Sequence, residues 1–85
     1  MDRVAALGIA IAKLRHSLGL TQPQLAERAG VSEASISLVE RGETRVAVDT
    51  LFAIADCLGV AASELLSIAE SQASRRELPG RRPKK

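Results

Sequence analysis

Few side chains in this sequence could take part in covalent chemistry. His16 is the only histidine among 85 residues, and no second histidine, cysteine or carboxylate lies nearby at the spacing of a metal site. Cys57 is the only cysteine, and its helical apolar surroundings are typical of a small buried residue more than of a reactive thiol. Without a phosphate-binding Gly-rich loop or a nucleophile beside a base, the sequence predicts no enzyme, no metal and no cofactor.

A different chemistry, hydrogen bonding to an anion, is available where two short helices are predicted to begin. Thr21 is placed to cap the first helix and Ser32 to cap the second. The first amides of a helix have no partner within it, so a helix N-terminus attracts anions. Gln22 in the first turn could hold a phosphate together with these amides.

Residues 21–42, TQPQLAERAGVSEASISLVERG, contain the signals that position these side chains. Thr21 and Gln24 have the spacing of a capping box, and Val31 and Ile36 that of a hydrophobic staple. The two helices are bounded by Thr21, Gly30, Ser32 and Gly42. Residues 21–42 therefore have the local form of a helix-turn-helix, in which a tight turn joins two short helices and the second helix can lie in the DNA major groove. An ordinary helical hairpin is the alternative.

Apolar residues at spacings of three and four predict three further helices, so we expect an all-α chain. One begins at Asp2 and ends near Leu18, one follows a loop over residues 43–47, and one begins near Ala62. Ala47 stands where a capping Ser or Thr is expected. The residues predicted to face inward in the first and fourth helices are Val4, Leu7, Ile11, Leu14 and Leu18, and Val48, Leu51, Ile54, Ala55 and Leu58.

Charge divides the chain into an acidic body and a basic tail. Residues 75–85 hold six Arg and Lys against one Glu, a net charge of +5, which leaves −3 on residues 1–74 of the total of +2. We expect residues 1–74 to form one domain with a small core and the Pro- and Gly-containing tail to be disordered. Phosphate contacts must then come from a local cluster of donors or from the tail.

The kind of nucleic acid is indicated by a lack of aromatic residues. The chain has one Phe and no Trp or Tyr, so bases could not stack on its surface as single strands and RNA usually require. Duplex DNA is favoured. No apolar stretch approaches the roughly 20 residues of a membrane span, so we expect a cytoplasmic protein without membrane contact.

Three apolar residues exceed what one small core should need. They are Phe52, Leu66 and Ile68. A helical monomer of this size would leave some of them exposed, so we expect them to form a homodimer interface.

The motifs resemble a known family. The succession L-G-L-T-Q-x-x-L-A-x-x-A-G-V-S, I-S-x-V-E-R-G and L-x-x-I-A-x-x-L-G-V is similar to the phage repressor and Cro type of helix-turn-helix, the XRE family, over residues 3–68. The resemblance implies a compact five-helix, lambda-repressor-like domain that binds palindromic operators as a dimer. It also implies a bacterial or phage-encoded transcription regulator at the nucleoid.

The resemblance assigns roles by position. Gln22 matches a residue that contacts phosphate and supports base readout, and Arg15 and Glu40 match a frequent ion pair between the first and third helices. Positions that face base edges are matched by Ser32, Glu33, Ala34 and Leu38, phosphate contacts by Ser35 and Arg41, and the loop along the DNA backbone by Thr44 and Arg45.

The chain departs from the family at the reading positions. Glu33 and Ala34 replace the Gln or Arg often found there. Glu33 can accept a hydrogen bond from the cytosine amino group, and Ala34 or Leu38 can touch a thymine methyl.

Several regulatory systems fit these observations. A restriction-modification controller and a short prophage repressor are both similar, and an antitoxin that also binds a toxin stays open. A protein interaction module that keeps the fold without binding DNA is the competing class, and the acidic body favours it.

Overall fold

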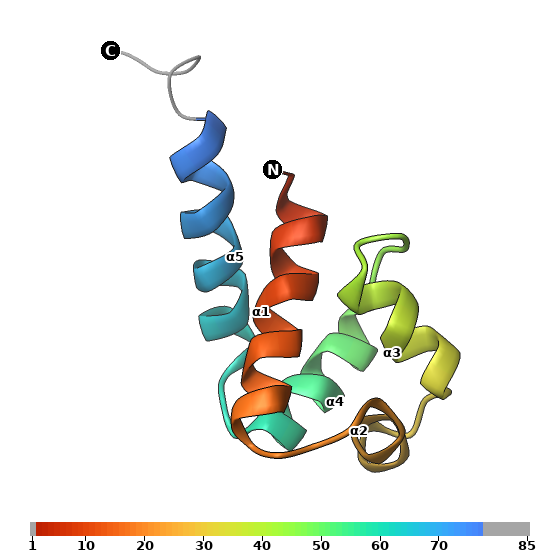
Figure 1. Ribbon diagram of the computed structural model, residues 1–85. Coiled ribbons are helices and arrows are strands. Elements are labelled where there is room, and N and C mark those ends of the chain that lie inside the picture. Colours follow the sequence, from red (N-terminus) through yellow and green to blue (C-terminus); the bar gives the residue numbers. More distant parts are fainter. Residues whose placement is uncertain (1, 78–85) are drawn as a thin grey trace.

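A computed structural model of the chain describes residues 2–77, with side chains up to residue 73 (Figure 1). The helices are α1 (Arg3–Ser17), α2 (Gln22–Ala29), α3 (Glu33–Glu40), α4 (Val48–Leu58) and α5 (Ala62–Glu77). The predicted all-α, five-helix fold is confirmed. The expected domain boundary after residue 74 falls inside α5, and residues 78–85 of the predicted tail lie outside the described part of the chain.

The helices begin at the predicted caps. The Asp2 carboxylate accepts a hydrogen bond from the Ala5 amide at 2.7 Å, and Thr21 and Gln24 form both hydrogen bonds of a capping box. Ala47 provides no side-chain hydrogen bond to the first turn of α4. Asp2, Thr21 and Gln24 fix the starts of α1 and α2 because they bond to amides of the first turn that have no partner within the helix. At the start of α4 these amides receive no such bond from the cap residue.

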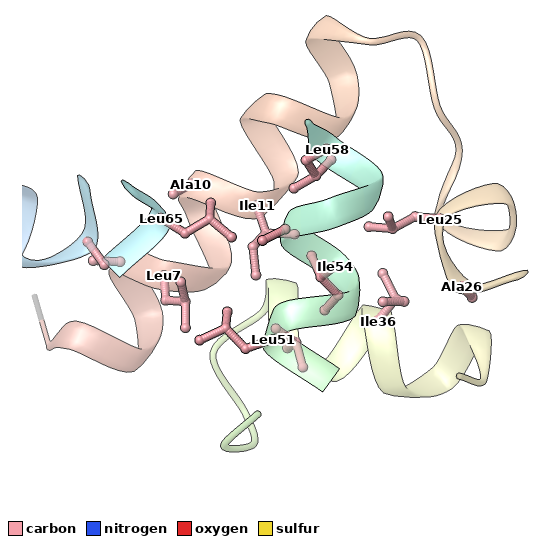
Figure 2. Packing of buried hydrophobic residues seen from close by; sticks show 14 of the residues in the cluster. Leu7, Ala10, Ile11, Leu25, Ala26, Ile36, Leu51, Ile54, Leu58 and Leu65 are labelled. Carbon is pink, nitrogen blue, oxygen red and sulfur yellow. The ribbon is translucent and has the colours of Figure 1, made fainter. Parts of the chain in front are cut away.

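Each helix places one large side chain fully inside the core. The largest fully buried side chains are Ile11, Leu25, Ile36, Ile54 and Leu65. Figure 2 shows α4, with Leu51 and Ile54, between core residues of α1 and α5 on one side and of α2 and α3 on the other. Helix α4 therefore occupies the centre of the core. In Figure 1, α5 runs antiparallel to α1 on one side, and α3 packs against α1 on the other.

The buried face of α1 differs from the predicted stripe. The prediction was wrong for Val4 and Leu18, which are 37% and 52% exposed, whereas Ala6 and Ala10 are buried. The reason is that α1 packs against both α3 and α5, so small residues face its neighbours on two sides. Leu18 follows the last turn of α1, where the chain turns away at Gly19.

In α4 the prediction was wrong for Val48, which is 68% exposed. Val48 is the first residue of α4, and the core contacts of this helix begin one turn later with Leu51.

Gly8 allows α1 and α3 to approach closely. A Cβ atom at this position would lie 2.3 Å from the Val39 carbonyl oxygen and 2.7 Å from that of Glu40. Gly42 has a similar role after α3, because its φ is +72° and an added Cβ would lie 2.9 Å from the Cα of Ala5. The glycines therefore set the position of α3, the helix on which the candidate site is built.

Candidate nucleic-acid interface

The turn between α2 and α3 is tight and fully hydrogen-bonded at both ends. Gly30 ends α2 in the left-handed conformation with φ at 76°, and the Val31 amide donates to the Ala26 carbonyl at 3.0 Å. Ser32 then caps α3 by accepting a hydrogen bond from the Ser35 amide at 3.1 Å. The exit of α2 and the entry of α3 are thus fixed by local chemistry.

The outward face of α3 carries small and polar side chains and one leucine, Leu38. Ile36 and Val39 are buried in the core, which turns the opposite side of the helix to solvent. The residues predicted to face the bases are all exposed on that side, and they are Ser32, Glu33, Ala34 and Leu38. Ser35 is half-buried beside them. Small side chains leave room for another molecule to come close to the helix backbone.

The two serines at the start of α3 are not equivalent donors. The Ser32 hydroxyl accepts from the Ser35 amide and donates its proton to the Ser35 hydroxyl oxygen at 2.9 Å. The Ser32 proton is therefore used inside the protein. Ser35 keeps its own proton, and a phosphate oxygen would accept it in a charge-assisted hydrogen bond.

The cation that follows α3 is paired with a carboxylate. Arg41 lies 3.3 Å from Glu43, and the two side chains are 58% and 56% exposed. Thr44 and Arg45 are exposed in the loop that follows. Sequence reasoning did not single out Glu43, although its spacing of two from Arg41 across Gly42 is a signal for such a pair.

The last residue of α3, Glu40, forms an ion pair with Arg15 of α1. Arg15 donates from Nε to Glu40 Oε2 at 2.7 Å and from Nη2 to Glu40 Oε1 at 2.9 Å. Its Nη1 also donates to the Leu20 carbonyl at 2.8 Å. The Arg15 and Glu40 side chains are only 8% and 6% exposed, so the pair joins α1 to α3 with little access to water.

Gln22 meets the same carboxylate. Its Nε2 donates to Glu40 Oε1 at 2.9 Å. Burial alone would raise the pKa of Glu40, but the hydrogen bonds from Arg15 and Gln22 and the positive charge of Arg15 lower it below its ordinary value. The hydrogen bond to Glu40 in turn raises the pKa of Arg15. Both groups are therefore charged at neutral pH.

An apolar groove of about 350 Å³ opens between α1, α4 and α5. Its lining includes Val4, Val48, Leu51 and Leu66, together with Thr44 and Arg45 from the loop after α3. Among the residues predicted for a dimer interface, Leu66 is 44% exposed in the groove and Phe52 is 57% exposed one turn after Val48. Ile68 is half-buried against the core and offers less surface.

Between residues 2 and 73, no three His, Cys, Asp or Glu side chains gather where they could hold a metal ion. No single helix in this part of the chain has the length and apolar composition to cross a membrane, whereas the bent pairs α1 with α2 and α4 with α5 meet these two criteria jointly.

Comparison with known proteins agrees with this geometry. The sequence model of a helix-turn-helix family matches residues 11–65. The HTH-type transcriptional regulator y4dJ of Sinorhizobium fredii, which is uncharacterized, is 39% identical over 67 residues, and these cover 79% of this chain and 87% of that protein.

Solved structures are similar over most of the chain. The clp gene regulator ClgR from Corynebacterium glutamicum has a TM-score of 0.81 at 30% identity, covering 93% of this chain and 88% of its own. The restriction-modification controller protein C.AhdI from Aeromonas hydrophila has a TM-score of 0.71 at 29% identity, covering 73% and 94%. The chain therefore belongs to the XRE-type helix-turn-helix family of DNA-binding transcriptional regulators, which are not enzymes.

Proposed function

We propose that this regulator binds a palindromic operator as a homodimer, with α3 of each copy in the major groove. The observation that carries this proposal is the outward face of α3, where exposed small residues stand on a helix fixed by buried contacts. An α-helix fits the major groove of B-DNA, and its side chains can then reach base edges. A regulator of this kind acts on the chromosome, so we expect it in the bacterial cytoplasm at the nucleoid.

In this proposal the exposed residues of α3 read the bases. Glu33 accepts a hydrogen bond from a cytosine amino group, because a carboxylate has only acceptor atoms. Ala34 and Leu38 contact thymine methyl groups, and Ser32 lies against the same base edges. A half-site containing cytosine next to thymine is therefore expected.

The residues around α3 hold the DNA backbone. Ser35 donates its free hydroxyl proton to a phosphate, and Gln22 contacts a second one. Arg41, Thr44 and Arg45 follow the backbone after α3, provided that phosphate replaces Glu43 as the partner of Arg41. Such contacts set register and orientation, and they add affinity without sequence information.

The second copy is proposed to cover the apolar groove. Phe52 and Leu66 are exposed large apolar side chains, and Val48 beside them is 68% exposed. A two-fold interface would bury these residues against the same residues of the partner. Two reading helices would then face half-sites about 34–36 Å apart, one turn of DNA.

The test is a binding titration against genomic DNA fragments at two salt concentrations. We expect a few fragments to bind far more tightly than the rest, roughly 10³-fold or more, and all binding to weaken as salt rises. Sedimentation at micromolar concentration should show a dimer. Uniform weak binding to every fragment, or a monomer bound to its operator, would contradict the proposal.

The apolar groove also favours a second candidate, an antitoxin or an interaction module that binds another protein. The net charge of −3 on residues 1–74 supports a protein partner more than DNA. Binding of no duplex DNA at low salt would select the interaction module, whereas an antitoxin would bind both its operator and its toxin. Neighbouring genes for a restriction enzyme, a toxin or phage proteins would identify the regulatory system.

A further inference from the structure

Gln22, the first residue of α2, is held by a carboxylate that belongs to the core. Its side-chain nitrogen donates to Glu40 Oε1 at 2.9 Å, and the Glu40 side chain is only 6% exposed. We propose that Glu40 is a positioning residue for DNA recognition, which fixes the Gln22 amide in one orientation at the DNA backbone. This role rests on the proposed function.

The orientation of the amide follows from the chemistry of its partner. An ionised carboxylate can only accept hydrogen bonds, so it must face the NH₂ group of Gln22 and not its carbonyl. Arg15 keeps Glu40 in place by donating to both of its oxygens, at 2.7 and 2.9 Å. A flipped Gln22 amide would set oxygen against oxygen. One N–H and the carbonyl of Gln22 stay available to a ligand.

The same contact separates Gln22 from the reading residue Glu33. Within the described residues, the side-chain hydrogen bond of Gln22 is made to Glu40, at the C-terminal end of α3, and not to Glu33 at its start. Both oxygens of Glu33 are thus left for a base. In this proposal Gln22 contacts the DNA backbone and Glu33 contacts a base, so the two residues can be changed independently.

A fixed side chain also binds at lower entropic cost. A glutamine on a helix surface samples several rotamers, and ordering it on binding reduces affinity. Here the ordering takes place during folding, because Glu40 is held by Arg15 before DNA arrives. The buried ion pair therefore contributes to affinity through Gln22, although neither charged side chain reaches the DNA.

The test is a double-mutant cycle on operator affinity with Gln22→Met, Glu40→Gln and the double variant. Each single change should lower affinity about 5- to 10-fold, the size of one hydrogen bond, and the double variant should lose no more than either single variant. Thr44→Ala is the matched control. It also lies at the proposed backbone contact but has no bond to Glu40, so its loss should multiply with that of Glu40→Gln.

A second measurement needs no variant and does not depend on whether Glu40→Gln folds. In the wild-type protein, the side-chain NH₂ of Gln22 should exchange with water more slowly than that of Gln24, whose carbonyl is bonded to the Thr21 amide at 2.9 Å. Equal exchange rates would overturn the positioning role.

The outcomes separate this role from the proposed function. If the wild-type protein binds operator but the losses of Gln22→Met and Glu40→Gln multiply, only the positioning role fails. If the wild-type protein binds no duplex DNA, the proposed function fails and the positioning role with it.

Discussion

Arg15 is almost completely buried, and hydrogen bonds to protein groups replace those that its guanidinium would make to water. Its guanidinium donates to both oxygens of Glu40 and to the Leu20 carbonyl. A buried ion pair adds little net stability compared with apolar residues, but it is costly to break, since the remaining charge is left without water or a partner. The resemblance of the motifs implied this pair, whereas its burial and its third member, Gln22, depend on packing that no spacing reveals.

Glu40→Ala is expected to destabilise the fold strongly. Removing the carboxylate leaves Arg15 charged and buried, which costs about 3–5 kcal/mol, a large part of the stability of a small domain. Chemical denaturation measures this free energy of unfolding. Glu43→Ala is the control, because its pair with Arg41 is more than half exposed and should contribute under about 1 kcal/mol. A loss below about 0.5 kcal/mol for Glu40→Ala would mean that water enters the pair.

The lowered pKa of Glu40 predicts a loss of stability in acid. The folded-state pKa lies below the unfolded value of about 4.3, so the stabilisation is complete above that value and is lost as the pH falls through the folded pKa. Denaturation of the wild-type protein and of Glu40→Gln from about pH 7 down to pH 3 tests this. The difference between their free energies of unfolding should shrink in acid. Parallel curves would contradict the assignment.

At the scale of the elements, the helix ends were predictable and the packing of α1 was not. Thr21, Ser32 and Gly30 act on their own turns, so their residue types and spacing were sufficient. Gly8 gave no such signal, because its importance depends on which backbone comes near it. The exposure of Val48 was missed for the same reason, since periodicity places a residue on a helix face but does not say where the neighbouring helix ends.

Gly8→Ala is expected to destabilise the domain, although alanine favours helices by about 1 kcal/mol over glycine. The new Cβ would lie 2.3 Å from the Val39 carbonyl oxygen, and both partners are backbone, so α1 or α3 must move. Such overpacking costs about 1–3 kcal/mol or more. Thermal unfolding measures it, with Lys13→Ala on the exposed side of α1 as a control near zero. A stabilised Gly8→Ala would show that the two helices separate easily.

Leu38→Ala tests the outward face of α3. Loss of apolar contact with a thymine methyl should weaken operator binding by roughly 1–3 kcal/mol and leave nonspecific binding and its salt dependence nearly unchanged. Leu18→Ala removes a leucine that is 52% exposed and caps the end of α1, outside the proposed reading face, so it should leave operator affinity nearly unchanged. Equal weakening on operator and random DNA would mean that α3 does not read the bases as proposed.

At the scale of the whole molecule, one groove touches both proposed interfaces. It is lined by Leu66 and Val48 from the proposed dimer face and by Thr44 and Arg45 from the proposed backbone contact. The sequence indicated surplus apolar residues because their number exceeds the needs of a small core. It did not indicate the groove, which exists only where α1, α4, α5 and the loop after α3 meet.

Phe52→Glu is expected to weaken dimerisation without unfolding the chain. Phe52 is 57% exposed in the described chain, so the monomer loses little by the change, while a two-fold interface would bring two carboxylates together. Sedimentation should show a shift toward monomer and operator affinity should fall. Leu18→Glu is the control, since Leu18 is 52% exposed, much like Phe52, but follows α1 and does not belong to the proposed dimer face on α4 and α5. An unchanged dimer would exclude this face.

The antiparallel packing of α1 on α5 has a consequence for synthesis on the ribosome (Figure 1). The two helices lie at opposite ends of the described chain, and translation at about 5–20 residues per second separates them by several seconds. During that time α1 lacks α5, one of the two helices that pack against it. Helix α3 is made in between and packs against α1 and α2, so its main contacts can form before α5 is made. An incomplete chain that lacks α5 therefore leaves one packed face of α1 uncovered, and we expect the domain to complete its fold only after α5 has been made.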